Sequence, residues 1–171
     1  MKWLNKKLET ATFAMGCFWQ PDYVFSKVNG IIKKRVGYTR CNKECNNPTY
    51  EQVCSSETGC AEAIQLLFDP AIVTYDELLD MFWKNHDPTQ MNRQGPDVGT
   101  QYRSAIFCHT AEQKRIARAS KKKWGKKLTD SALKIVTEIV SASAFYPAED
   151  YHQDYLQRTG RSCHISTSPF V

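Results

Sequence analysis

The stretch Glu9 to Trp19, ETATFAMGCFW, decides the fold, because an apolar run ends at a Gly-Cys pair and leads directly into a helix. The apolar residues from Leu8 to Met15 predict a strand. Pro21, in the first turn of the following segment, favours a helix that begins just after Cys17. The sequence therefore places a thiol at a strand-to-helix turn.

Strands and helices alternate along the rest of the chain, which indicates an α/β or α+β class with one sheet and helices packed on it. We expect strands over 31–38, 61–68, 102–109 and 133–140, and helices over 75–83, 111–127 and 149–158. The connection 87–101 is rich in Pro and Gly, and a connection of that length inside a compact domain is usually functional. At 171 residues, the chain is predicted to be one domain over residues 1–171, with a flexible tail from about residue 159.

The composition excludes several classes of protein. With 42% hydrophobic and 24% charged residues, the chain is typical of a globular protein and not of a disordered one. No apolar run approaches the ~18 residues of a membrane span, and the basic start lacks the apolar core of a signal peptide. We expect a cytoplasmic protein that does not insert into membranes. The net charge of +5 is too weak to indicate nucleic-acid binding.

Cys17 is the first candidate catalytic residue. The positive end of the helix dipole stabilises a thiolate at this turn, which favours a nucleophile. Phe18 and Trp19 follow at once, and their rings suit a dry pocket for a small apolar group such as a thioether methyl. The alternative is a buried structural thiol beside two core aromatics.

A thiolate that attacks an electrophile with a leaving oxygen needs a proton donor. Glu62 stands at the start of an apolar strand, where burial would raise its pKa and keep it protonated as a general acid. Tyr50, Tyr102 and Asp97 lie beside loops from which they can reach a cleft. Each has a plainer reading: a solvent-exposed Glu, packing tyrosines, and an Asx turn at Asp97.

The other thiols leave two possibilities open. Cys163, in a polar tail, can carry a second thiol towards an oxidised first one, or it has no function. The remaining cysteines of the middle segment have the spacing C-x3-C, x8, C-x5-C, of which the first pair suits a structural zinc site. They are Cys41, Cys45, Cys54 and Cys60, while Cys108 lies in an apolar run and is read as a core thiol.

Taken together, the motifs resemble the peptide methionine sulfoxide reductases of the A class over nearly the whole chain. The resemblance rests on ATFAMGCFW, RVGYT, NPTYEQVCS, TGCAEA, FWKNHDPTQMNRQGPDVGTQYRSAIF, VTEI and FYPAEDYHQDYLQR, in the order of the family. It implies a ferredoxin-like α/β (α+β) fold, a two-layer sandwich of a mixed β-sheet with packed helices. It also implies reduction of the S epimer of methionine sulfoxide, free or in peptides, without a bound cofactor or metal.

The resemblance also implies roles for single residues. Cys17 would attack the sulfoxide sulfur and become a sulfenic acid, while Glu62 would protonate the oxygen. Tyr50 and Tyr102 would hydrogen-bond that oxygen, and Asp97 would hold a substrate amine or a water. Phe18 and Trp19 would enclose the methyl group. Cys163 would then form a disulfide with Cys17, which thioredoxin, or dithiothreitol in vitro, would reduce.

Two departures from the family pattern stand beside this resemblance. Gln20-Pro21-Asp22 follows GCFW where a small residue and then a Glu are usual, and Cys60 stands where His is usual. The loop before NPTY also holds two thiols. Two alternatives therefore stay open beside a monomeric reductase: a zinc-stabilised binding module and a thiol peroxidase.

Overall fold

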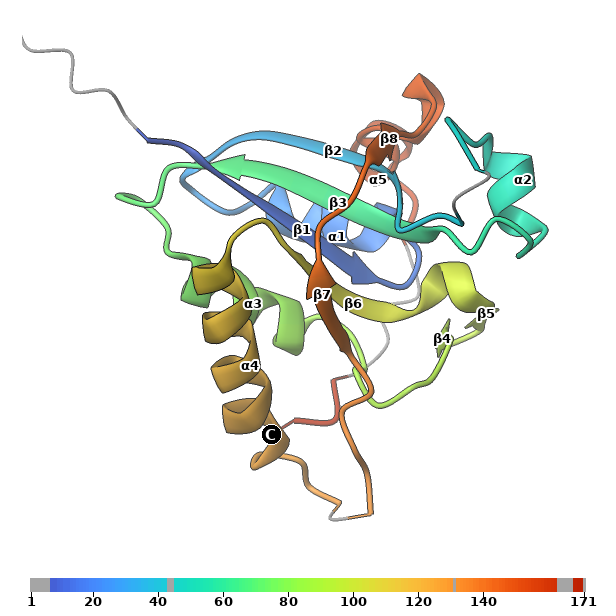
Figure 1. The fold of residues 1–171 in the computed structure, drawn as a ribbon. Helices are drawn as coiled ribbons and strands as arrows, with labels where there is room; N and C mark the ends of the chain where they lie inside the picture. The colour runs from blue at the N-terminus through green and yellow to red at the C-terminus, as the bar shows by residue number, and fades with distance from the viewer. Residues whose placement is uncertain (1–6, 43–44, 131, 163–167, 171) are drawn as a thin grey trace, which may run out of the picture.

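The computed structural model describes residues 7–42, 45–130, 132–162 and 168–170. Six strands form one mixed sheet in the order β7-β6-β1-β3-β2-β8, in which β6 and β7 are parallel and all other neighbours are antiparallel (Figure 1). The strands are β1 (Glu9–Met15), β2 (Ile31–Thr39), β3 (Ala61–Phe68), β6 (Ser104–Cys108), β7 (Glu138–Ser141) and β8 (Phe145–Pro147). A separate two-stranded ladder pairs β4 (Arg93–Gln94) with β5 (Asp97–Val98).

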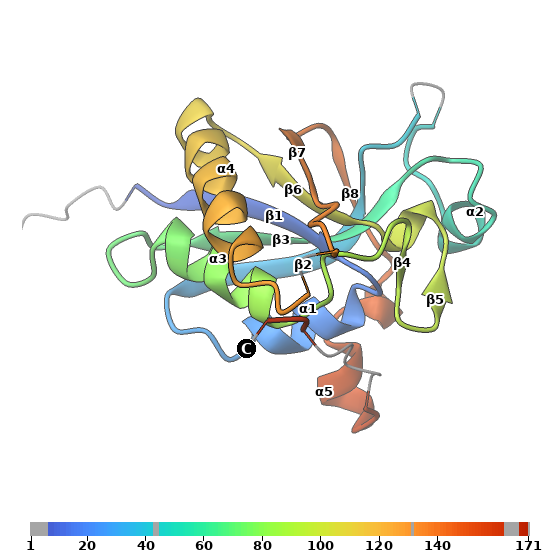
Figure 2. The same ribbon diagram turned by 90° about the horizontal axis from the view of Figure 1, so that it is seen from below.

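Three helices cover one face of the sheet and form the second layer (Figures 1 and 2). They are α1 (Trp19–Phe25), α3 (Tyr75–Lys84) and α4 (Ala111–Gly125). The chain between β7 and β8 crosses the opposite face, because these strands lie at opposite edges of the sheet (Figure 1). Smaller elements are α2 (Tyr50–Cys54), α5 (Tyr155–Thr159) and the 3-10 turns η1 (Thr100–Tyr102) and η2 (Asp150–His152). The predicted mixed sheet with packed helices is confirmed.

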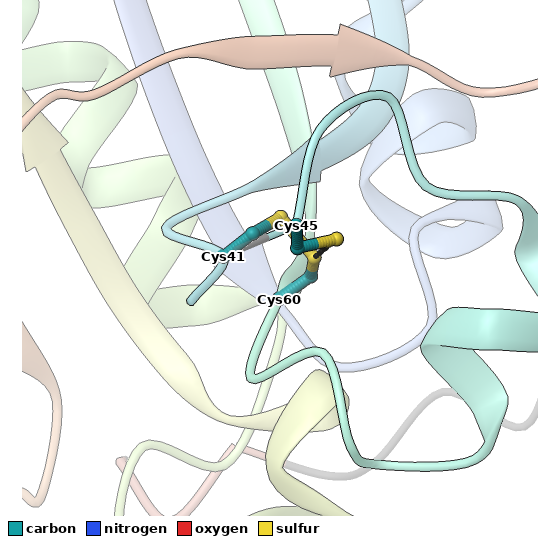
Figure 3. Close-up of side chains that lie close together, drawn as sticks. All are labelled: Cys41, Cys45 and Cys60. Carbon is teal, nitrogen blue, oxygen red and sulfur yellow. Dashed lines mark hydrogen bonds between the residues drawn. A yellow bond between two sulfur atoms is a disulfide. The ribbon is translucent and has the colours of Figure 1, made fainter. Parts of the chain in front are cut away.

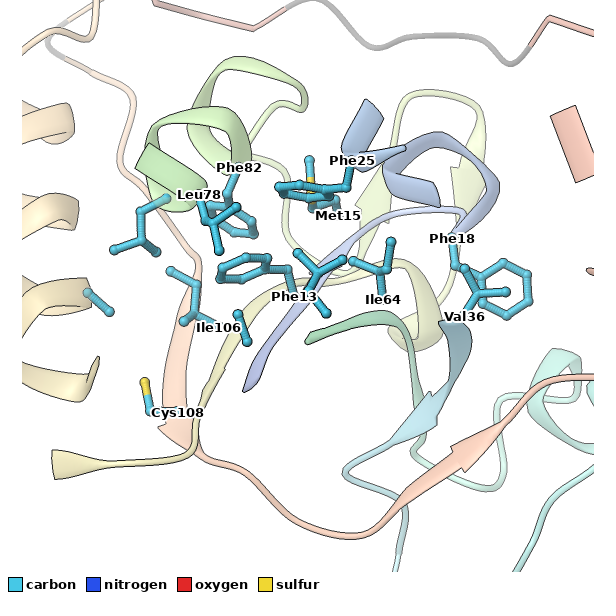
Figure 4. Close-up of a cluster of buried hydrophobic side chains, with 14 of the residues drawn as sticks. Phe13, Met15, Phe18, Phe25, Val36, Ile64, Leu78, Phe82, Ile106 and Cys108 are labelled. Atoms are coloured by element: carbon cyan, nitrogen blue, oxygen red, sulfur yellow. The ribbon is translucent and has the colours of Figure 1, made fainter. Parts of the chain in front are cut away.

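The main core lies between the sheet and these helices (Figure 4). Along β1, alternate residues face opposite sides, so that Phe13 and Met15 enter this core while Ala14 joins a small cluster on the other face. The ring of Phe13 lies 5.7 Å from that of Phe25 and 5.4 Å from that of Phe82, centroid to centroid. Removal of such a buried ring costs about 3–5 kcal/mol of stability, so these contacts fix α1 and α3 on β1.

Helix α3 begins where the sequence indicates, because Thr74 forms a capping box with Glu77. The Thr74 hydroxyl accepts from the Glu77 backbone N–H at 3.2 Å, and the Glu77 carboxylate accepts from the Thr74 N–H at 2.8 Å. Short α2 has the same motif at Thr49 and Gln52. Two polar residues thus define each helix start.

Several elements differ from the prediction, and the connection 87–101 contains β4, β5 and the start of η1, none of which was predicted. Strand β7 begins at Glu138 and is shorter than the predicted 133–140, while α2 and β8 were not predicted. The predicted helix 149–158 is divided into η2 and α5 by Asp154, whose φ is +53°. The cause is a tertiary contact, since the carboxylate of Asp22 accepts the Asp154 backbone N–H at 2.8 Å. In the described part of the chain, no helix is both long and apolar enough to span a bilayer.

Candidate active site

Cys17 lies at the turn from β1 into α1, and Gly16 makes that turn possible. The φ of Gly16 is +87°, and a Cβ on it would lie 2.5 Å from the Cβ of Gln94. A side chain at this position would therefore be strained by its backbone and would collide with the connection 87–101. Half-buried Cys17 faces a pocket of about 300 Å³ that Trp19 and Asp97 also line.

Glu62 is hydrogen-bonded to the residue that follows Cys17 in the chain. It belongs to the alternate positions of β3 that include core residue Ile64, so its side chain points to the helix side of the sheet. Its carboxylate is 1% exposed and accepts the backbone N–H of Phe18 at 3.0 Å. The predicted solvent-facing alternative for Glu62 is wrong, because the side chain is buried.

The two candidate tyrosines lie around the carboxylate of Glu62. Both are half-buried. Burial is the main cause that raises the pKa of Tyr102, and the charges of Glu62, Asp97 and Cys17 raise it further. Burial is also the main cause that raises the pKa of Tyr50. The hydrogen bond with Cys54 and the charges of Tyr102 and Glu62 raise it further. Both phenols therefore keep their protons at neutral pH and can donate hydrogen bonds.

Asp97 reaches this cluster because the connection 87–101 is folded on itself. Gly95, with a φ of +58°, makes the turn between β4 and β5. Buried Gln94 closes the base of the connection: its amide accepts from the Asp87 N–H and donates to the Asp87 carbonyl, both at 3.0 Å. Gln94 also packs against Gly16, so the segment that carries Asp97 is fixed beside Cys17.

The two aromatics after Cys17 have different surroundings. Trp19 lines the pocket, its ring stacks on Tyr155 at 3.9 Å, and its indole N–H donates to Nδ1 of His152 at 3.1 Å. Phe18 is 1% exposed and packs against Tyr38 and His152. Trp19 can therefore contact a ligand in the pocket, whereas the buried ring of Phe18 packs under the turn and stabilises it. Enclosure of a methyl group by these rings stays a prediction.

His152 and Glu149 support the site and were not predicted. His152 is buried, with an exposed fraction of 2%. Burial lowers its pKa, so the ring is neutral and its Nδ1 accepts from Trp19. Glu149 accepts the Tyr38 hydroxyl and the Tyr50 backbone N–H, each at 2.9 Å. The acid and the imidazole three residues apart in AEDYH, between aromatic residues, were the available signal.

The unusual residues after GCFW have structural partners. Asp22 is 1% exposed and forms an ion pair of 2.5 Å with Lys34 of β2. Burial nevertheless outweighs that ion pair and raises the pKa of Asp22. The side-chain amide of Gln20 donates to the carbonyl of Asn85, after α3. These residues tie α1 to its neighbours, and neither lines the pocket beside Cys17.

The remaining thiols fall into three groups. Cys163 lies outside the described residues, and the residue before it, Ser162, lines the pocket beside Cys17. Cys108 is buried as predicted and Cys54 is exposed on α2. Cys41 and Cys60 form a disulfide, and Cys45 lies beside them. Of the four cysteines weighed for zinc, Cys54 does not belong to the sulfur cluster.

The chain is similar to known proteins over most of its length. The family model of peptide methionine sulfoxide reductase matches residues 9–171. A peptide methionine sulfoxide reductase MsrA from Geobacter metallireducens is 55% identical over 158 residues, which cover 92% of this chain and 96% of that relative.

Solved structures show the same similarity in space. Reduced Mxr1 from Saccharomyces cerevisiae superimposes with a TM-score of 0.88 at 34% identity, over 99% of this chain and 95% of Mxr1. Mxr1 in complex with Trx2 superimposes with a TM-score of 0.63 at 26% identity, over 100% of this chain and 96% of that one. The chain belongs to the peptide methionine sulfoxide reductase family of the MsrA type and is an oxidoreductase.

Proposed function

We propose that this protein reduces the S epimer of methionine sulfoxide, free and in peptides, with Cys17 as the nucleophile and Glu62 as the acid. The observation that carries the assignment is the 3.0 Å hydrogen bond from the Phe18 N–H to the buried carboxylate of Glu62. It holds a carboxyl group beside the thiol, where a sulfoxide oxygen would leave. In its protonated form this carboxyl group can donate a proton to that oxygen.

In the first half-reaction, the thiolate of Cys17 attacks the sulfoxide sulfur. Glu62 gives its proton to the sulfoxide oxygen, the bond between methionine sulfur and oxygen breaks, and methionine leaves as a thioether. The oxygen stays on Cys17 as a sulfenic acid, so the sulfoxide is reduced by two electrons while Cys17 is oxidised by two. The proton of Glu62 returns from solvent.

The surrounding groups stabilise this step. The phenols of Tyr50 and Tyr102 keep their protons and donate to the oxygen as negative charge develops on it. Asp97, in the same pocket as Cys17, holds the amine of the substrate or an ordered water. The exposed side of Trp19 contacts the methyl group.

The second half-reaction returns Cys17 to the thiol. The thiol of Cys163 attacks the sulfenic sulfur, water leaves and a Cys17–Cys163 disulfide forms, which thioredoxin reduces by exchange. The position of Ser162 in the Cys17 pocket supports this route, as does the existence of a complex between the relative Mxr1 and Trx2. The route requires no bound cofactor. We further propose that the protein acts as a monomer in the cytoplasm.

The test measures methionine formation from the separate S and R epimers, with dithiothreitol as the reductant. We expect wild type to use the S epimer, Cys17→Ser to form no methionine, and Glu62→Gln to lose about 10²–10⁴-fold in rate at neutral pH. The matched control is Glu57→Gln, an exposed Glu that precedes the same strand and is expected to keep the wild-type rate.

Two results would refute the proposal. One is a Glu62→Gln rate equal to that of Glu57→Gln, which would remove the acid. The other is faster turnover of a hydroperoxide than of either sulfoxide epimer, which would favour the thiol peroxidase.

A further inference from the structure

Three cysteine sulfurs gather at the ends of two central strands, in a cluster that the proposed reaction does not use. Cys41 follows β2 and Cys60 precedes β3, so both lie just beyond the last pair of that antiparallel ladder, Thr39 and Ala61. Cys45 comes from the loop. The Sγ atoms of the three cysteines all lie within 4.8 Å of one another (Figure 3).

The backbone holds this cluster together independently of the disulfide. The N–H of Asn42 donates to the Thr58 carbonyl at 2.8 Å, and the Asn42 side chain donates to the Glu57 carbonyl at 2.9 Å. The N–H of Cys45 donates to the Asn42 carbonyl at 3.0 Å. These bonds join the segment after β2 to the segment before β3, so the three cysteines stay neighbours when the disulfide is reduced.

The position of Cys45 does not suit attack on the disulfide. In thiol–disulfide exchange the attacking sulfur approaches along the S–S axis. The Sγ of Cys45 lies 3.9 Å from the Sγ of Cys60. If it lay on the S–S axis, it would be nearly 6 Å from the Sγ of Cys41, because a disulfide bond is about 2 Å long. Because the Sγ atoms of Cys45 and Cys41 lie within 4.8 Å of each other, Cys45 lies beside the S–S bond and not on its axis. The three sulfurs therefore form a compact triangle.

Once the bond between Cys41 and Cys60 is reduced and these two sulfurs separate, such a triangle fits a thiolate-bound metal. Tetrahedral zinc has Zn–S bonds of about 2.3 Å, which place neighbouring sulfurs about 3.8 Å apart. The separation of Cys45 and Cys60 is 3.9 Å, and the spacing of Cys41 and Cys45, C-x3-C, is one that zinc ligands use. Cys60 is buried while Cys41 and Cys45 are half-buried, so the site has a protected base and an open side.

We propose that the reduced protein binds one zinc ion through the thiolates of Cys41, Cys45 and Cys60, with water in the fourth position. The disulfide and the metal exclude each other, because the disulfide leaves no thiolate on Cys41 or Cys60. A dithiol opens the site: it is oxidised to its own disulfide, and Cys41 and Cys60 gain two electrons and two protons. Zinc then binds as the three thiols lose their protons.

The experiment uses the full chain, reduced with dithiothreitol, freed of reductant without air and titrated with Co²⁺ and then with Zn²⁺. Thiolate-bound cobalt gives a sulfur-to-metal charge-transfer band, and competition with a coloured chelator gives the zinc affinity. We expect one metal per chain in the reduced protein and none in the oxidised protein. Cys45→Ser, which keeps the disulfide pair, should weaken zinc binding at least ~100-fold, because even outer-sphere changes cost 10–100-fold.

The matched control is Cys54→Ser, which removes the exposed thiol of α2 and should bind metal like wild type. Circular dichroism and urea unfolding report whether Cys45→Ser is folded. Alkylation of the reduced wild-type protein provides a test without any variant: zinc should protect Cys41, Cys45 and Cys60 and leave Cys54 reactive.

The proposal is overturned if the reduced wild type shows no thiolate–cobalt band, or if Cys54→Ser weakens binding as much as Cys45→Ser. A Cys45–Cys60 disulfide in peptide maps of reduced protein re-oxidised in the presence of zinc would also overturn it, in favour of a thiol-exchange site. None of these outcomes depends on sulfoxide reduction, so the metal site and the proposed function fail separately.

Discussion

Gly16→Ala tests how the turn at Cys17 is built. Alanine at a φ of +87° costs about 1–2 kcal/mol, because its Cβ approaches the carbonyl oxygen. The new Cβ would also lie 2.5 Å from the Cβ of Gln94, and overpacking of this kind costs about 1–3 kcal/mol. Alanine also restricts the unfolded chain, which stabilises the folded protein by about 0.4–1 kcal/mol and offsets part of this cost. We expect a net loss of about 2–4 kcal/mol in the free energy of unfolding.

The same substitution should reduce activity, because relief of the collision moves Gln94 and with it the segment that carries Asp97. A displacement of about 1 Å at a catalytic site can cost about 10²-fold in rate. The matched control is Gly95→Ala, where φ is +58° and no atom lies within 4 Å of the new Cβ. This control retains the backbone cost without the collision.

Urea unfolding and the kcat/KM for the S sulfoxide measure both effects. We expect Gly95→Ala to lose less than about 2 kcal/mol and to keep nearly wild-type kcat/KM. If Gly16→Ala is no less stable than Gly95→Ala and equally active, the contact between the Cys17 turn and Gln94 does not organise the site.

Three further predictions concern His86, Trp19 and Cys163. Burial lowers the pKa of His86 to about 4, from 6.5 in the unfolded chain, so its stabilising effect is complete above pH 6.5 and is lost as the pH falls to 4. Between pH 7 and pH 4 the free energy of unfolding, measured with urea, should fall by about 3 kcal/mol less in His86→Gln than in wild type. Parallel pH profiles of the two proteins would contradict this. Trp19→Phe keeps an apolar ring and loses the hydrogen bond to His152, so kcat/KM for a peptide sulfoxide should fall about fivefold, and an unchanged value would show that the indole N–H is not needed. Cys163→Ser should form one methionine per chain in a single turnover but should not turn over with thioredoxin, whereas a wild-type thioredoxin-driven rate would remove Cys163 from the cycle.

Much of the fold could be predicted, because local signals and tertiary contacts agree over the central elements. Strand 61–68 and the start of α3 follow the prediction, since apolar patterning and the Thr74 cap point to the same boundaries. The helix predicted over 149–158 was divided because Asp22, more than a hundred residues away, takes the Asp154 N–H. A local pattern contains no information about such a contact. The predictions of one domain over residues 1–171 and of a tail from about residue 159 stay predictions.

The candidate site divides in the same way. The side chains of Cys17, Glu62, Tyr50, Tyr102 and Asp97 have reactive or hydrogen-bonding groups that can be recognised in the sequence. In the structure Cys17 and Asp97 line one pocket, Glu62 accepts the N–H of Phe18, and the two tyrosines lie within electrostatic reach of Glu62.

The supporting residues of the site could not be inferred from the sequence. His152 acts by accepting from Trp19, and Gln94 acts by packing on Gly16. Each role depends on a partner far away in the sequence. The triangle of cysteine sulfurs likewise forms only when β2 and β3 pair, because that pairing brings Cys41 next to Cys60.

The most direct test of Cys17 as the nucleophile is to identify the oxidised sulfur after one turnover. Cys163→Ser is mixed with the S sulfoxide in the absence of reductant, dimedone traps any sulfenic acid, and peptide mass spectrometry locates the adduct. We expect about one methionine per chain, with the adduct on the peptide that contains Cys17. Methionine formation with the adduct on another cysteine, or with no change at Cys17, would contradict this expectation.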